Sequence, residues 1–152
     1  MGLIHKGLFT DMAVTVPVGK IDSSAMKLLE VTEKALEVGI ASAKGGNRVG
    51  HMSNAIEVFV KPYGFGKVEE LAGHGVGYKV HEDPYVPNYG NKNSGPILAP
   101  GMIIAIEPML NEGTKALVLS PDGYTYRTAD GKRSAHFEKT IAITKTGVEI
   151  LT

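Results

Sequence analysis

From Val68 to the end of the chain the sequence has no convincing helical periodicity, and this constrains the fold more than any other feature. Short apolar runs rich in β-branched residues alternate there with turn signals such as Pro121-Asp122-Gly123. This pattern is typical of many short β-strands. The predicted strands are Val68–Leu71, Val76–Val80, Met102–Met109, Ala116–Leu119, Tyr124–Thr128, His136–Thr144 and Glu149–Leu151.

Two helices are predicted ahead of these strands. The first begins at Asp22-Ser23, whose side chains can cap free N–H groups, and has apolar residues at helical spacing as far as Ile40. Lys44-Gly45-Gly46 is expected to end it, with a cation near the negative end and glycine as a left-handed cap. The second helix is predicted from about His51 to Val60, and Pro62 follows it.

Residues 3–18 are predicted to form a hairpin or a bent strand. Gly7 marks the turn, and Pro17 indicates that the strand ends there or lies at a sheet edge. Strand, two helices and then many strands is the order expected of an α+β fold. We therefore predict a curved, mostly antiparallel sheet with two helices on one face, formed by a single domain over residues 1–152.

The amino-acid composition limits the partners and the metal ligands that this chain can use. Sixteen Lys and Arg balance sixteen Asp and Glu, so nothing favours nucleic acid or an anionic membrane surface as a partner. The chain has no cysteine, so any metal has to be held by imidazole and carboxylate groups. The sequence has neither a long apolar run nor a signal pattern, and the expected compartment is the cytoplasm.

Two histidines and three acids are the candidate functional residues. His74 has glycine on both sides, which lets other backbone approach closely, and His81 follows seven residues later. Asp11, Glu107 and Glu138 each lie in or beside a predicted strand. Taken alone, each of the five is more commonly a surface or structural residue. Taken together, an imidazole and three carboxylates on separate strands are typical of a divalent metal site.

Five segments in order resemble the methionine aminopeptidases of the pita-bread metallopeptidase family, and they span essentially the whole chain. The resemblance implies that fold, here in part, and metal-dependent removal of the N-terminal methionine from peptides and nascent proteins. The segments are Gly7–Asp11, Gly73–Gly77, Val80–Pro84, Pro100–Pro108 and Ser134–Thr140.

The same resemblance assigns roles to individual residues. It implies that the metal ligands are Asp11, His74, Glu107 and Glu138, holding two ions of Co, Mn, Fe or Zn in an intact site. Glu107 would also move protons, and His81 would contact the substrate peptide bond. The resemblance also implies that Val80 and Tyr124 line the pocket that holds the methionine side chain.

One departure from the family pattern affects these expectations. The family has a further metal aspartate eleven residues before the position of Asp11, which would fall immediately before Met1. We therefore expect a truncated catalytic domain in which one of the two ions is weakened and turnover is low. Self-association through surface exposed by the truncation is also expected.

Two other functions stay open at this stage. A related Xaa-Pro dipeptidase would share the ligand set. A catalytically inactive binding module would keep the fold and use its groove for partners.

Overall fold

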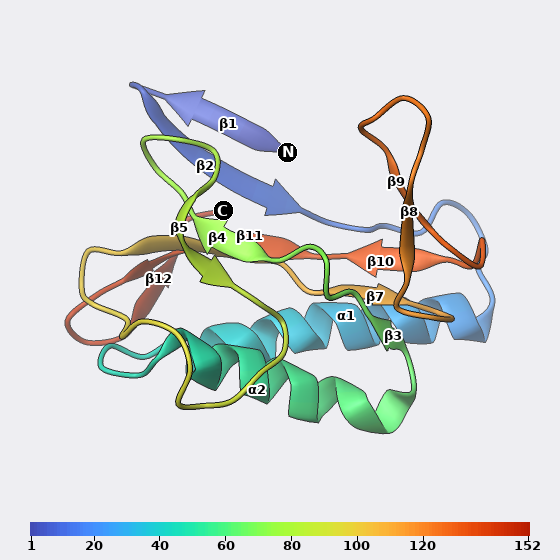
Figure 1. Ribbon diagram of the computed structural model, residues 1–152, viewed down its shortest axis with the longest axis horizontal. Helices are drawn as coiled ribbons and strands as arrows, with labels where there is room; N and C mark the ends of the chain where they lie inside the picture. The colour runs from blue at the N-terminus through green and yellow to red at the C-terminus, as the bar shows by residue number, and fades with distance from the viewer.

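The computed structural model describes residues 1–152 and has a curved antiparallel sheet with two long helices on one face (Figure 1). The elements in chain order are β1 (Gly2–His5), β2 (Leu8–Ala13), α1 (Ser23–Ser42), α2 (Val49–Val60), a 3-10 turn (Lys61–Tyr63), β3 (Gly66–Lys67), β4 (Gly73–Gly75), β5 (Glu82–Val86), β6 (Ile103–Ile106), β7 (Met109–Asn111), β8 (Leu117–Leu119), β9 (Tyr126–Thr128), β10 (Ser134–His136), β11 (Glu138–Ile143) and β12 (Val148–Ile150). No helix is long and apolar enough to cross a membrane.

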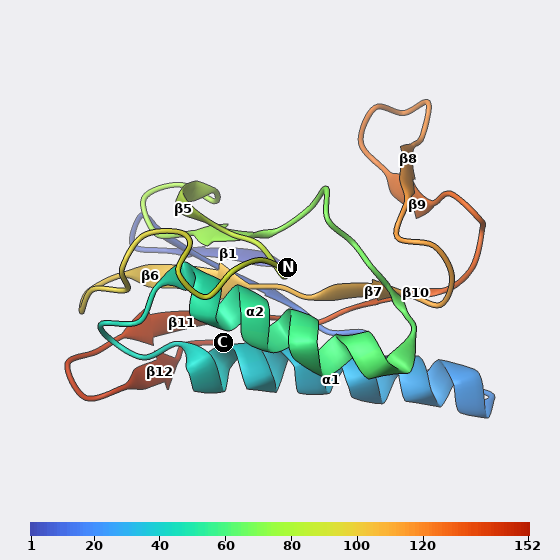
Figure 2. The same ribbon diagram turned by 60° about the horizontal axis from the view of Figure 1, so that its bottom comes forward.

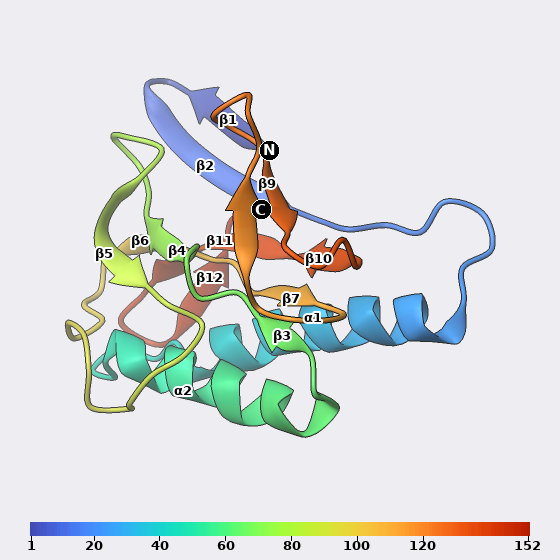
Figure 3. The ribbon, with the colours of Figure 1, turned by 45° about the vertical axis from the view of Figure 1, so that its right-hand side comes forward.

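The main sheet has the strand order β1-β2-β11-β6-β4-β5, and β12 pairs with β11. All of its neighbouring strands are antiparallel. A smaller sheet has the order β10-β7-β3, and β8 and β9 form a separate hairpin that stands away from the body of the molecule (Figures 1 and 3). The predicted curved, mostly antiparallel sheet is therefore confirmed.

Both predicted helices form and lie along one face of the sheet (Figure 2). The Asp22 carboxylate caps α1 by accepting a hydrogen bond of 2.8 Å from the Ala25 amide, as its sequence position predicts. The predicted glycine cap is wrong, because α1 ends at Ala43 with φ −82°. One buried apolar core joins the helices to the sheet, and it includes Leu28, Met52, Ile56, Ile104 and Ile141.

The strand that carries His74 was not among those predicted. Val76–Val80 is not a strand; β4 is instead the Gly-His-Gly segment just before it. A Cβ on Gly73 would lie 2.3 Å from the Ala105 carbonyl oxygen, and one on Gly75 would lie 2.1 Å from that of Asp83. The neighbouring backbones therefore need glycine on both sides of His74, although glycine has low strand propensity.

Other predicted strands also differ from the structure. Val68–Leu71 is not a strand, and β5 was missed altogether. Two long predicted strands are each divided, Met102–Met109 into β6 and β7, and His136–Thr144 into β10 and β11. The paired strands β6 and β11 thus lie in the main sheet, whereas their continuations β7 and β10 pair in the smaller one. Both breaks occur beside predicted acids, so the bend in the sheet positions Glu107 and Glu138.

Candidate metal centre

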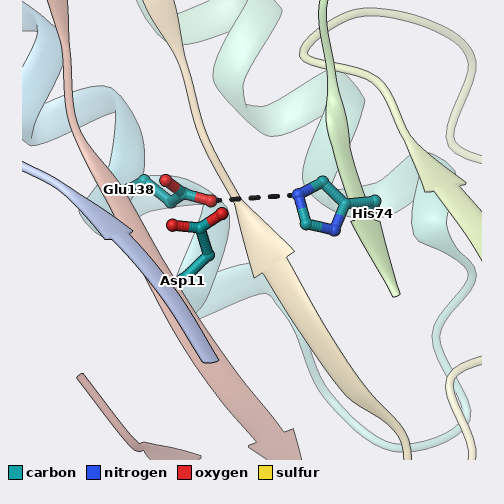
Figure 4. A group of neighbouring side chains, drawn as sticks. All are labelled: Asp11, His74 and Glu138. Carbon is teal, nitrogen blue, oxygen red and sulfur yellow. Dashed lines mark ion pairs between the residues drawn. The ribbon is translucent and has the colours of Figure 1, made fainter. Parts of the chain in front are cut away.

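Three of the four predicted ligands meet on the face of the main sheet opposite the helices. Asp11 comes from β2, His74 from β4 and Glu138 from the start of β11, and Figure 4 shows their side chains pointing toward one another. One potential ligand atom from each lies within 4.8 Å of the others. His74 Nε2 is 4.0 Å from Glu138 Oε1. This spacing suits a shared ion bound at about 2.0–2.2 Å by each atom.

Glu107 completes the group. It follows β6 directly, and β6 lies between β11 and β4 in the sheet. Its Oε1 atom lies 3.7 Å from His74 Nε2. The four side chains thus converge from four neighbouring strands, although the residues are as much as 127 positions apart in sequence (138 − 11).

The backbone contacts that hold Asp11 and His74 explain their orientation. The Thr140 hydroxyl donates to the Asp11 carbonyl at 2.7 Å and accepts from the Asp11 amide at 2.9 Å. His74 Nδ1 lies 2.9 Å from the carbonyl oxygen of Gly75. A proton on Nδ1 that donates to this carbonyl leaves the Nε2 lone pair facing the carboxylates, the tautomer that a metal ligand needs.

The site has more negative than positive charge. None of its three carboxylates pairs with a lysine or arginine, and the N-terminal ammonium group of Met1 lies 3.3 Å from Asp11 Oδ1. Glu138 is only 3% exposed. Burial, together with the charges of Glu107 and Asp11, raises the pKa of Glu138 to about 8, against the opposing effect of the ammonium group. A divalent cation would relieve this repulsion, so the residues fit a metal ion.

His81 lies beside the metal group, just before β5. Its ring centroid is 4.3 Å from that of His74, and the two rings meet edge to face. Both histidines line an open depression of about 560 Å³. Val80 is half-buried next to His81, whereas Tyr124 is 87% exposed in the turn between β8 and β9. The structure therefore brings His81 to the centre and places Tyr124 outside both metal-ligand groups.

One residue of this region was missed by the sequence reasoning. His136, at the end of β10, forms a second potential ligand group with Glu107 and Glu138, again with atoms within 4.8 Å. The available signal was the pattern His136-x-Glu138, which places both side chains on one face of an extended chain.

Comparisons with known proteins agree with this geometry. The model of metallopeptidase family M24 matches residues 1–145. Methionine aminopeptidase 1 of Bacillus subtilis is 51% identical over 152 residues, which is all of this chain and 61% of that protein. The chain thus spans about three fifths of the length of this relative.

Solved structures give the same result for the fold. A crystal structure of methionine aminopeptidase from Thermotoga maritima matches 99% of this chain and 61% of its own, with 46% identity and a TM-score of 0.96. A prolidase from Pyrococcus horikoshii matches 99% of this chain and 38% of its own, with 27% identity and a TM-score of 0.77. The sheet and helices have the pita-bread arrangement that these enzymes share. The chain belongs to metallopeptidase family M24.

Proposed function

We propose that residues 1–152 are the part of a methionine aminopeptidase catalytic domain that carries its metal centre. The reaction is hydrolytic removal of the N-terminal methionine from peptides and nascent proteins. Because nascent proteins are made in the cytoplasm, we propose that compartment for the protein. The convergence of Asp11, His74, Glu107 and Glu138 is the observation that carries this proposal. The similarity to methionine aminopeptidases over nearly the whole chain supports the choice of substrate.

The ligand set indicates which ions are suitable. Imidazole and carboxylate donors accept Mn²⁺, Fe²⁺, Co²⁺ or Zn²⁺, and availability decides among them. When bound, such ions lower the pKa of coordinated water and polarise the scissile carbonyl. Asp11, His74, Glu107 and Glu138 together form a full ligand set for one ion. We expect a further ion to be held more weakly, because it has to share carboxylates with the first.

The chain's own groups then have distinct tasks. Glu107 accepts a proton from the attacking water and returns it to the leaving amine, a general acid–base role. His81 stabilises the charge that develops at the scissile peptide bond. Val80, next to His81, contributes to the methionine pocket, where an apolar lining suits the thioether side chain. A pocket role for Tyr124, which is 87% exposed in the turn between β8 and β9, stays a prediction.

A peptidase assay tests this function. With Mn²⁺ or Co²⁺, the protein is expected to cleave methionine from a Met-Ala peptide and to prefer it to an Ala-Pro peptide. E107Q should lower turnover at least about 100-fold, the size of effect expected when a proton-transfer group is lost. E149Q is the matched control, because Glu149 is exposed on β12. Low turnover of this chain stays a prediction, and the same assay measures it.

The other outcomes assign the function differently. Preference for the Ala-Pro peptide would favour the dipeptidase activity that the prolidase fold also serves. Metal-dependent hydrolysis of neither peptide, in protein that binds the ion, would contradict an enzymatic role and favour a binding module.

Self-association is a separate prediction. Strand β1 lies at the edge of the main sheet, and Leu3 and Ile4 on it are each 60% exposed. An unpaired edge with exposed apolar side chains favours pairing between chains. We expect light scattering to give a mass above 16.2 kDa, and L3K/I4K to shift it toward that value. A monomeric mass for the unchanged chain at high concentration would contradict the prediction.

A further inference from the structure

Glu107 lies at a gap in the pairing of the sheet. On one side of its chain, β6 pairs with β4 only as far as Ala105. The pairing resumes on that side where the Val68 amide donates to the Met109 carbonyl at 3.1 Å, next to β3. No residue of β3 or β4 is paired with Glu107, so its carbonyl needs a donor from elsewhere.

Asn88 supplies that donor from the loop after β5. Its Nδ2 atom donates to the Glu107 carbonyl at 3.1 Å, and only 1% of the residue is exposed. A buried carbonyl that loses its donor costs free energy, because water cannot reach it to replace the bond. The side chain of Asn88 therefore takes the place of the missing strand beside Glu107.

Contacts on both sides of Asn88 fix its position. Two residues before it, the buried Val86 pairs with β4. Two residues after it, the Gly90 amide donates to the Glu57 carboxylate at 2.9 Å, and the Gly90 carbonyl accepts from Asn54 Nδ2 at 3.0 Å. Glu57 and Asn54 belong to α2, to which the chain descends after β5 (Figure 1). The loop is thus anchored at the sheet and at a helix, with Asn88 midway.

The position of the Glu107 carboxylate depends on this backbone contact. On the opposite side of the same junction, the Phe137 amide donates to the Pro108 carbonyl at 3.4 Å, which is long for a hydrogen bond. The shorter contact from Asn88 is therefore the stronger restraint on the Glu107 backbone. Glu107 Oε1 lies 3.7 Å from His74 Nε2, and the side chains of such a site have to be held to within about 0.5 Å.

We propose that Asn88 is a positioning residue for the metal centre. By holding the Glu107 backbone at the bend of the sheet, it sets where the Glu107 carboxylate meets the ion. Asn88 acts through Glu107 and does not bind the ion itself. The inference rests on the metal centre of the proposed function. Supporting groups of this kind are usually worth about 10- to 100-fold in metal affinity.

Asn111 provides a matched control. It is also fully buried, and its Nδ2 atom also donates to a backbone carbonyl, that of Thr114, at 2.9 Å. In both asparagines the Oδ1 atom is buried and makes no hydrogen bond. Thr114 lies between β7 and β8 and is not a metal ligand. N88L and N111L therefore remove the same kind of bond from equally buried positions, and urea unfolding should show a similar loss of stability for both.

Metal binding separates the two variants. By calorimetry with Mn²⁺, N88L should bind at least about tenfold more weakly than the unchanged protein, whereas N111L should bind as the unchanged protein does. The visible absorption of bound Co²⁺ reports the geometry of its ligands. At saturating Co²⁺, N88L should therefore shift the absorption bands and N111L should leave them in place. N88S and N111S form a milder pair, to be compared in the same way if a leucine variant does not fold.

The other outcomes have distinct meanings. Equal Mn²⁺ affinity in N88L and N111L, with an unshifted Co²⁺ spectrum in both, would overturn the positioning role and leave the metal centre intact. An equal loss of affinity in both variants would also overturn it, because general loosening of the fold would then explain the effect. Failure of the unchanged protein to bind Mn²⁺ would instead reject the proposed metal centre, and the role of Asn88 with it.

Discussion

Replacing Glu138 with glutamine is expected to remove tight binding of divalent ions altogether. Glu138 is the one residue common to both potential ligand groups, and its side chain is almost completely buried. An amide has one weak donor oxygen and no charge, so neither group keeps enough ligands. By calorimetry with Mn²⁺ we expect affinity to fall at least about 100-fold, the upper end of effects seen when only a supporting group is lost.

The comparison with other variants makes this result specific. H74N should remove the tighter ion alone, and the exposed control E149Q should bind as the unchanged protein does. Tight binding that survives in E138Q would contradict a centre shared through Glu138.

The second large effect concerns the metal-free protein, whose stability we expect to fall as the pH rises from about 5 to about 8. Glu138 has a folded pKa of about 8 against an ordinary value of 4.5. Between these values the unfolded chain has lost the proton that the folded chain retains. Raising the pH therefore favours unfolding. The loss is on the order of a few kcal/mol, because each pKa unit corresponds to about 1.4 kcal/mol.

Urea unfolding of metal-free protein at a series of pH values measures this dependence. E138Q carries no titrating group at this position, so it should lose most of the slope and be more stable than the unchanged protein at pH 8. E149Q should keep the slope. If the metal-free protein instead becomes more stable over this pH range, Glu138 loses its proton in the folded protein without a large free-energy cost, and the prediction is wrong.

The helices were predictable because local rules decide them. In α1, the cap at Asp22 and the apolar spacing of Leu28 and Leu36 act within a few residues of one another. The segment around His74 failed for the opposite reason. Its glycines are required by close contact with the backbones of β5 and β6, which belong to other strands of the sheet, and strand propensity contains no information about that contact.

The candidate site was predictable residue by residue only through the resemblance to a family. Asp11, Glu107 and Glu138 each have an ordinary surface explanation in the sequence. The structure brings them together because antiparallel strands β2, β11 and β6 are neighbours, and that order cannot be read from local patterns. His136 was missed because its role depends on the bend at Phe137, where the paired strands pass from one sheet to the other.

Diffraction from crystals soaked in Mn²⁺, collected where manganese scatters anomalously, tests the central claim most directly. The account predicts a strong anomalous peak among Asp11, His74, Glu107 and Glu138, at the 2.0–2.2 Å that is roughly usual for such ligands. Absence of any peak among these four side chains, in crystals whose solution contains saturating Mn²⁺, would contradict it.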